Sequence, residues 1–140
     1  MKSKLPLIAR VLLGLIFTAS GVVGLFKLYP LPPDLPEKLK AFHTGMEATG
    51  YFFPLLRGTE LICGLLLLVG IFVPLALVVL APVVLNIILI HAFIAPNGLP
   101  LAIVIAFLMS YLAFFSEPYS AIVKQIFRCP KKEGMDAKKN

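Results

Sequence analysis

The stretch PLALVVLAPVVLNIILIHAFIA, which covers residues 74–95, decides the class of fold. It contains no acidic residue, lysine or arginine, and Asn86 and His91 are its only strongly polar side chains. An α-helix needs about 20 consecutive apolar residues to cross the hydrocarbon core of a bilayer. The stretch therefore predicts a membrane-spanning helix, with a kink at Pro82 because proline removes a helical hydrogen bond.

Three further apolar runs have the length of a membrane span, and glycine or proline residues lie near their ends. They cover residues 5–28, 51–72 and 99–115. A cleavable signal peptide is the alternative for the first run, because Lys2 and Lys4 precede it. Taken as four spans, the runs predict an all-α integral membrane protein, a four-helix bundle that forms a single domain over residues 1–140.

Composition and charge agree with a membrane protein. Hydrophobic residues make up 59% of the chain and charged residues only 14%, far from the balance of a soluble domain. The net charge of +6 comes largely from lysines and arginines near the two ends of the chain, so it does not indicate a nucleic-acid partner. By the positive-inside rule, this distribution predicts a multi-pass membrane protein with both termini in the cytoplasm.

Residues 29–50 form the predicted outer loop, and four prolines in it exclude a regular spanning helix. Within the loop, Leu35, Leu39, Phe42 and Met46 recur at helical spacing. This pattern predicts a short helix, which lies either at the membrane interface or as a cap over the mouth of the bundle.

Residues 117–140 form a basic cytoplasmic tail. Its apolar residues are expected against the bilayer and its basic residues toward anionic headgroups. The former are Ile122, Val123, Ile126 and Phe127, and the latter are Lys124 and Arg128.

Arg57 and Glu60 lie inside the second apolar run, where a charged side chain costs about 2.5 to 3.5 kcal/mol at the centre of the membrane. Their spacing of three residues places them on one face of a helix and permits an ion pair. Counted at about 1.5 Å per residue, Ser20, Asn86 and His91 fall in the same outer leaflet.

The candidate ligand or pocket residues are therefore Ser20, Arg57, Glu60, Asn86 and His91. In one interpretation they line a cavity that opens outward, where Glu60 or His91 takes up a proton. In the other, the polar residues only fix the register of the helices. Asn86 and His91 are five residues apart, so both face Glu60 only if the helix kinks or rotates.

The remaining reactive side chains give weaker indications. His43 in the outer loop either caps the cavity or has no role, and the second interpretation is favoured. Cys63 and Cys129 are expected to be free thiols, because one lies in an apolar run and the other in the charged tail. Two histidines without clustered cysteines or acids predict no metal site. No catalytic residue is assigned.

Three stretches resemble the DoxX family of small bacterial four-helix membrane proteins: ARVLLGLIFTASGVVGLFKL (9–28), TGYFFPLLRGTELICGLLLLVG (49–70) and VPLALVVLAPVVLNIILIHAFIAP (73–96). The resemblance implies a four-helix bundle in the bacterial inner membrane. Some members of that family are linked to quinone-dependent oxidation of thiosulfate or to thiol redox complexes, and distant relatives look like assembly factors.

Two main hypotheses follow. The first is a small membrane subunit of a quinone-linked or thiol and thiosulfate redox system, associated with an oxidoreductase, with quinone as the candidate cofactor. The second is a non-catalytic assembly or interaction protein. The partners that the sequence suggests are the lipid bilayer, a quinone or other small apolar ligand, a membrane or redox protein, and a second copy of the chain. A transporter is less favoured, because four short spans enclose little volume.

Overall fold

The computed structural model describes residues 3–128, and the elements within this range are all helical. The order along the chain is α1 (Leu5–Leu25), α2 (Glu37–Ala48), α3 (Phe52–Val69), α4 (Val73–Phe93), the 3₁₀ turn η1 (Pro96–Gly98), α5 (Leu99–Phe114) and α6 (Tyr119–Ile126). Among these residues four segments are long and apolar enough to cross a membrane, namely α1, α3, α4, and η1 together with α5. The predicted all-α membrane fold is confirmed.

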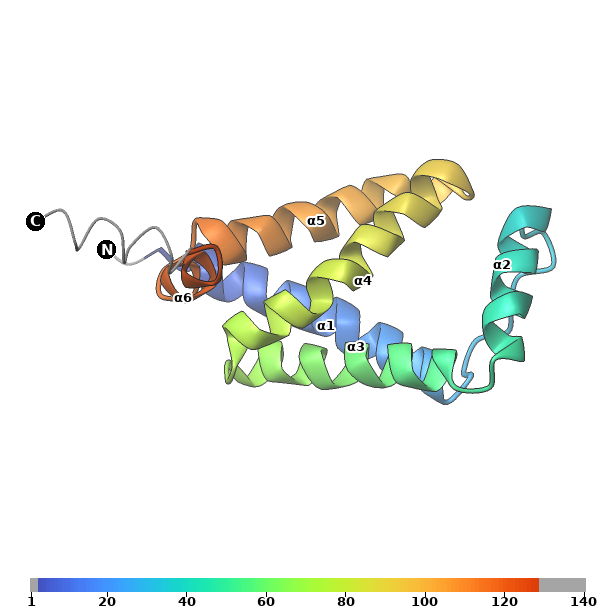
Figure 1. Cartoon of the computed structure of the whole chain (residues 1–140), viewed down its shortest axis with the longest axis horizontal. Coiled ribbons are helices and arrows are strands. Elements are labelled where there is room, and N and C mark those ends of the chain that lie inside the picture. Colours follow the sequence, from blue (N-terminus) through green and yellow to red (C-terminus); the bar gives the residue numbers. More distant parts are fainter. Residues whose placement is uncertain (1–2, 129–140) are drawn as a thin grey trace, which may run out of the picture.

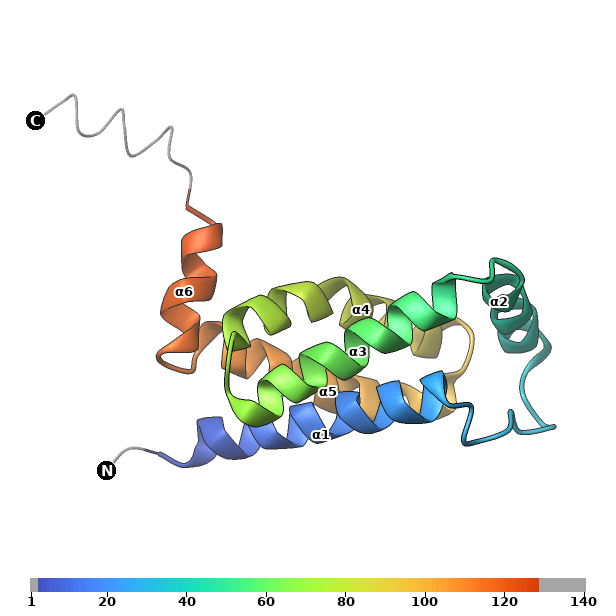
Figure 2. The ribbon, with the colours of Figure 1, turned by 90° about the horizontal axis from the view of Figure 1, so that it is seen from below.

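The four long helices form two antiparallel pairs. Helices α1 and α3 lie side by side, and α4 and α5 form the second pair (Figure 1). Helices α3 and α4 meet at the short turn that connects them and diverge toward their other ends (Figure 1). The start of α1 and helix α6 lie at one end of the bundle, and α2 lies across the other end (Figure 2). We refer to these as the α6 end and the α2 end.

Two spans are shorter than their apolar runs, and the backbone gives the reason. Helix α1 stops at Leu25 rather than at residue 28, because Lys27 has a positive φ of 48° and Pro30 follows. Helix α3 stops at Val69, because Gly70 has a φ of 85° and its N–H bonds to the carbonyl of Leu66. Helix α4 continues through Pro82, which lies within it as predicted from the apolar run.

Glycine allows α1 and α3 to approach closely. A Cβ atom added to Gly21 would lie 2.7 Å from the backbone nitrogen of Leu61, and one added to Gly14 would lie 3.0 Å from the carbonyl oxygen of Gly64. Small residues at such positions are the usual packing device between helices in lipid. Around this contact, Leu13, Phe17, Leu67, Leu77, Leu80 and Leu112 are fully buried.

The two short helices complete the bundle. The predicted helix in the outer loop forms as α2, with Leu39, Phe42 and Met46 half-buried, and it contacts α3. In α6, the side chain of Val123 is buried in the bundle, so the expectation that it faces the bilayer is wrong. The packing of α6 against α4 and α5 turns this residue inward, while Ile122 stays exposed.

Candidate functional site: an outer pocket above a buried ion pair

Three of the predicted site residues form one polar cluster between α1 and α3. The Arg57 guanidinium donates from Nη1 to Glu60 Oε2 at 2.8 Å, which is also an ion pair, and to Ser20 Oγ at 2.8 Å. The Ser20 hydroxyl donates to the same Glu60 oxygen at 3.0 Å. The cost of placing two charges within a membrane span is therefore offset by mutual pairing and by a hydroxyl from the neighbouring helix.

The two charged residues of this cluster differ in exposure. Glu60 is 2% exposed, whereas 26% of the Arg57 side chain remains accessible. Gly24 makes room for the stem of Arg57, because a Cβ atom there would lie 2.7 Å from Arg57 Cγ. Glu60 is thus sealed between the helices, while Arg57 extends from it toward the α2 end.

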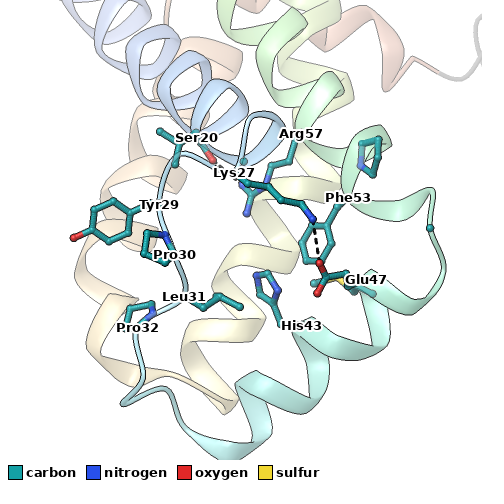
Figure 3. Close-up of a pocket in the computed structure, with 15 residues that line it drawn as sticks. Ser20, Lys27, Tyr29, Pro30, Leu31, Pro32, His43, Glu47, Phe53 and Arg57 are labelled. Carbon is teal, nitrogen blue, oxygen red and sulfur yellow. Dashed lines mark hydrogen bonds and ion pairs between the residues drawn. The ribbon is translucent and has the colours of Figure 1, made fainter.

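Arg57 and Ser20 line a pocket of about 660 Å³ at the α2 end of the bundle. The pocket lies between the end of α1, the proline-rich segment, α2 and the start of α3 (Figure 3). Its apolar lining includes Val23, Leu31, Met46 and Phe53. We call this cavity the outer pocket.

Lys27, His43 and Glu47 also line the outer pocket, and the sequence had suggested a role at the cavity only for His43. Lys27 Nζ and Glu47 Oε1 form an exposed ion pair at 3.3 Å between the end of α1 and α2 (Figure 3). The ring of His43 lies against the ring of Phe53 with centroids 4.5 Å apart. Nδ1 of His43 is buried and has no hydrogen-bond partner among residues 3–128.

The surroundings of His43 keep its ring neutral. Partial burial lowers the pKa of His43 below its ordinary value, the positive charge of Arg57 lowers it further, and Glu47 acts in the opposite direction. The other charges of the pocket cancel, because Lys27 pairs with Glu47 and Arg57 pairs with Glu60. An apolar cavity with balanced charge and a few convergent polar groups suits an uncharged ligand with a polar head.

The structure does not bring Asn86 and His91 to this pocket. Neither residue lines it, since the end of α4 that carries them lies away from the start of α3 (Figure 1). Nδ1 of His91 lies 3.0 Å from the carbonyl oxygen of Ala95, one turn on, and the ring covers Gly98. Asn86 makes no side-chain hydrogen bond to another described residue. Of the five candidate residues, the structure therefore brings together Ser20, Arg57 and Glu60, and it leaves Asn86 and His91 outside this cluster.

The cysteine and metal expectations have separate outcomes. Cys63 is a free, buried thiol in α3 that does not line the outer pocket. Cys129 lies outside the described residues. Within residues 3–128 no three His, Cys, Asp or Glu side chains lie together as metal ligands would.

Comparison with known proteins identifies the family. The family whose model matches the chain is DoxX, over residues 5–93, which is more than half of the sequence and includes α1 to α4 and every residue that lines the outer pocket. Neither the curated proteins nor the solved structures give a match. On the strength of the family match, this four-span membrane protein belongs to the DoxX family.

Proposed function

We propose that the protein binds a small, uncharged, amphipathic molecule of the quinone class in the outer pocket, as a membrane subunit of a quinone-linked redox system. The observation that carries this proposal is the position of Arg57. Glu60 and Ser20 hold one guanidinium nitrogen, Nη1, in a defined place, and 26% of the Arg57 side chain stays accessible where it lines a pocket of about 660 Å³.

The shape and chemistry of the pocket support a quinone head group. Its volume lies within the roughly 300 to 1,000 Å³ that is usual for small-molecule sites. A quinone ring is flat and apolar and carries carbonyl oxygens, which accept hydrogen bonds from a guanidinium. Apolar walls such as Leu31 and Phe53 suit the ring, and the balanced charge of the pocket gives no preference to an ion.

His43 is the pocket residue best suited to exchange a proton with such a ligand. Reduction of a quinone to a quinol consumes two electrons and two protons. His43 lines the pocket, and its lowered pKa keeps the ring neutral and able to accept a proton from a quinol. Glu60, which the sequence also suggested, does not line the pocket. We place the electron donor or acceptor in a thiol or thiosulfate redox partner, as the resemblance to DoxX proteins implies.

The proposed orientation has the α2 end outside the cell inner membrane and both termini in the cytoplasm. Lys4, Arg10, Lys124 and Arg128 belong to the α6 end, in keeping with the positive-inside rule. The outer pocket would then exchange its ligand with the outer leaflet.

A second candidate function, that of an assembly or interaction protein, is favoured by a different observation. Glu60 is sealed in direct contact with Arg57 and Ser20, as expected of a residue that holds two helices in register. In that case Glu60→Gln weakens the fold or the capture of a partner protein, and the outer pocket has no ligand.

The test is binding of decylubiquinone to the purified full chain, followed by native mass spectrometry and by a titration. Leu31→Trp fills the pocket without changing a residue of the Arg57–Glu60 ion pair. Arg57→Lys keeps the positive charge but loses the planar guanidinium and its paired N–H donors. We expect both variants to lose affinity about tenfold or more. His91→Ala, a control outside the pocket, keeps wild-type affinity. Absence of binding to the wild type, or equal binding by Leu31→Trp, would favour the assembly function.

A further inference from the structure

Arg10 carries a charge within a membrane span and has no counter-ion among residues 3–128. It lies in the second turn of α1, about 7.5 Å along the helix from Leu5. The ion pairs within residues 3–128 do not include it, whereas Arg57, the other arginine of the spans, is paired with Glu60. Nε of Arg10 is buried and has no hydrogen-bond partner among the same residues. The described chain therefore supplies no anion to this guanidinium.

Packing fixes the position of the Arg10 side chain. Its guanidinium lies over Gly70, the residue that ends α3, in the space that a side chain at Gly70 would occupy. The positive φ of Gly70 gives a second reason for glycine at this point. The carbonyl end of α3 carries a partial negative charge of about one half, so it offsets only part of the arginine charge.

The described residues at the α6 end carry a surplus of positive charge. The basic residues described at this end are Lys4, Arg10, Lys124 and Arg128, and Glu117 in the turn before α6 is the only acidic one. Glu117 is exposed and does not pair with Arg10. A ligand with a cationic group would be repelled here, and a ligand with net negative charge would be attracted.

We propose that Arg10 binds the phosphate of an anionic phospholipid at the α6 end of the bundle. The guanidinium presents a planar set of N–H donors that matches two phosphate oxygens. An arginine one to two turns inside a span reaches back to the level of the headgroups. The acyl chains would lie along the exposed apolar side chains of α1, such as Leu7 and Leu12.

The test is retention of lipid by the full chain, with phosphatidylglycerol as the anionic probe and phosphatidylcholine as the zwitterionic one, followed by native mass spectrometry. We expect wild-type protein to retain phosphatidylglycerol about tenfold more strongly than Arg10→Gln does. Lys4→Gln is the matched control, because it removes one exposed positive charge from the same end, and it keeps wild-type retention.

Each other outcome has a defined meaning. Equal retention of phosphatidylglycerol by Arg10→Gln and the wild type, or equal retention of phosphatidylcholine and phosphatidylglycerol, overturns the proposal. Displacement of the lipid by inorganic phosphate at millimolar concentration would identify a free-anion site instead. If Arg10→Gln does not fold, Arg10→Lys gives the decisive comparison: it keeps the charge, and we expect it to retain phosphatidylglycerol more weakly than the wild type.

Discussion

The α1–α3 pair and the α4–α5 pair solve the problem of helix association in lipid in different ways. Between α1 and α3, glycine brings the backbones together and a hydroxyl, a guanidinium and a carboxylate bond across the contact. In α4 and α5 the buried side chains are all apolar, and the polar His91 bonds only within its own chain segment. The difference indicates that the α1–α3 pair is held by close backbone contact and by polar bonds, while the α4–α5 pair is held by apolar packing.

Of the substitutions that test this comparison, removal of Glu60 should lower the free energy of unfolding most. In Glu60→Ala the Arg57 guanidinium and the Ser20 hydroxyl lose their shared acceptor inside the membrane. Breaking a buried ion pair from one side destabilises proteins by about 3 to 5 kcal/mol when the remaining charge stays buried, and the partial accessibility of Arg57 places the expected loss at the lower end of this range. We expect a loss of this order in the free energy of unfolding, measured by denaturant titration in detergent micelles.

The matched control for Glu60→Ala is Asn86→Ala in the other pair. Asn86 makes no side-chain hydrogen bond to a described residue, so its removal should change the free energy of unfolding by less than about 0.5 kcal/mol. Equal losses in the two variants would show that the α4–α5 pair also depends on its polar residues, and the contrast between the pairs would fail.

A smaller effect is expected when the close approach of α1 and α3 is blocked. Gly21→Val places a branched side chain where a Cβ atom already lies 2.7 Å from the backbone of Leu61. Overpacking of this kind costs about 1 to 3 kcal/mol, because the helices must move apart. Thermal unfolding followed by circular dichroism would measure the loss.

Gly58→Ala is the control for that substitution. Gly58 also lies in α3, but no heavy atom lies within 4 Å of a Cβ atom placed there. The change should be neutral or should stabilise the protein by up to about 1 kcal/mol, since alanine favours helix over glycine. A loss of stability in Gly58→Ala as large as that in Gly21→Val would contradict the proposed role of close packing.

The sequence predicted the spans well because the lipid environment requires length and apolarity, which can be counted along the chain. It also predicted the contact of Arg57 with Glu60, because a spacing of three residues fixes two side chains on one helical face. The predicted helix ends were less accurate: α1 ends at Leu25 and not at residue 28, because the positive φ of Lys27 cannot be predicted from hydropathy.

The candidate site was only partly predictable, for a geometric reason. Residue counting gives the depth of a side chain in the membrane but not its direction around the helix. Asn86 therefore shared a predicted depth with Glu60, although it makes no hydrogen bond to the polar cluster and α3 and α4 diverge from their connecting turn (Figure 1). The sequence did not assign a role to His43, because the pocket that it lines forms only where α2 lies over the start of α3, and this contact cannot be read from residue spacing. The helical spacing that includes Phe42 and Met46 was the one available signal.

The smallest expected effect concerns the pH dependence that His43 gives to the α1–α3 side of the bundle. The pKa of His43 in the folded protein lies below the value of about 6.5 that the unfolded chain would have. As the pH falls below about 6.5, the unfolded state therefore takes up a proton before the folded state does, and the free energy of unfolding decreases. The decrease levels off as the pH falls below the lowered pKa of the folded protein, and His43 contributes no slope once the pH is more than about one unit above 6.5.

The thermal midpoint of the wild type should accordingly fall between pH 7 and pH 5 more than that of His43→Gln, which keeps a polar side chain but cannot titrate in this range. Burial of the ring is the larger cause of the low pKa of His43 and the charge of Arg57 is the smaller one, so an apolar ligand that buries the ring further should steepen the slope. A wild-type slope no steeper than that of His43→Gln would mean that protonation of His43 is not coupled to folding, and the proton-exchange role proposed for this residue would lose its physical basis. A steeper slope that decylubiquinone increases further would instead connect the ring of His43 with the occupied outer pocket.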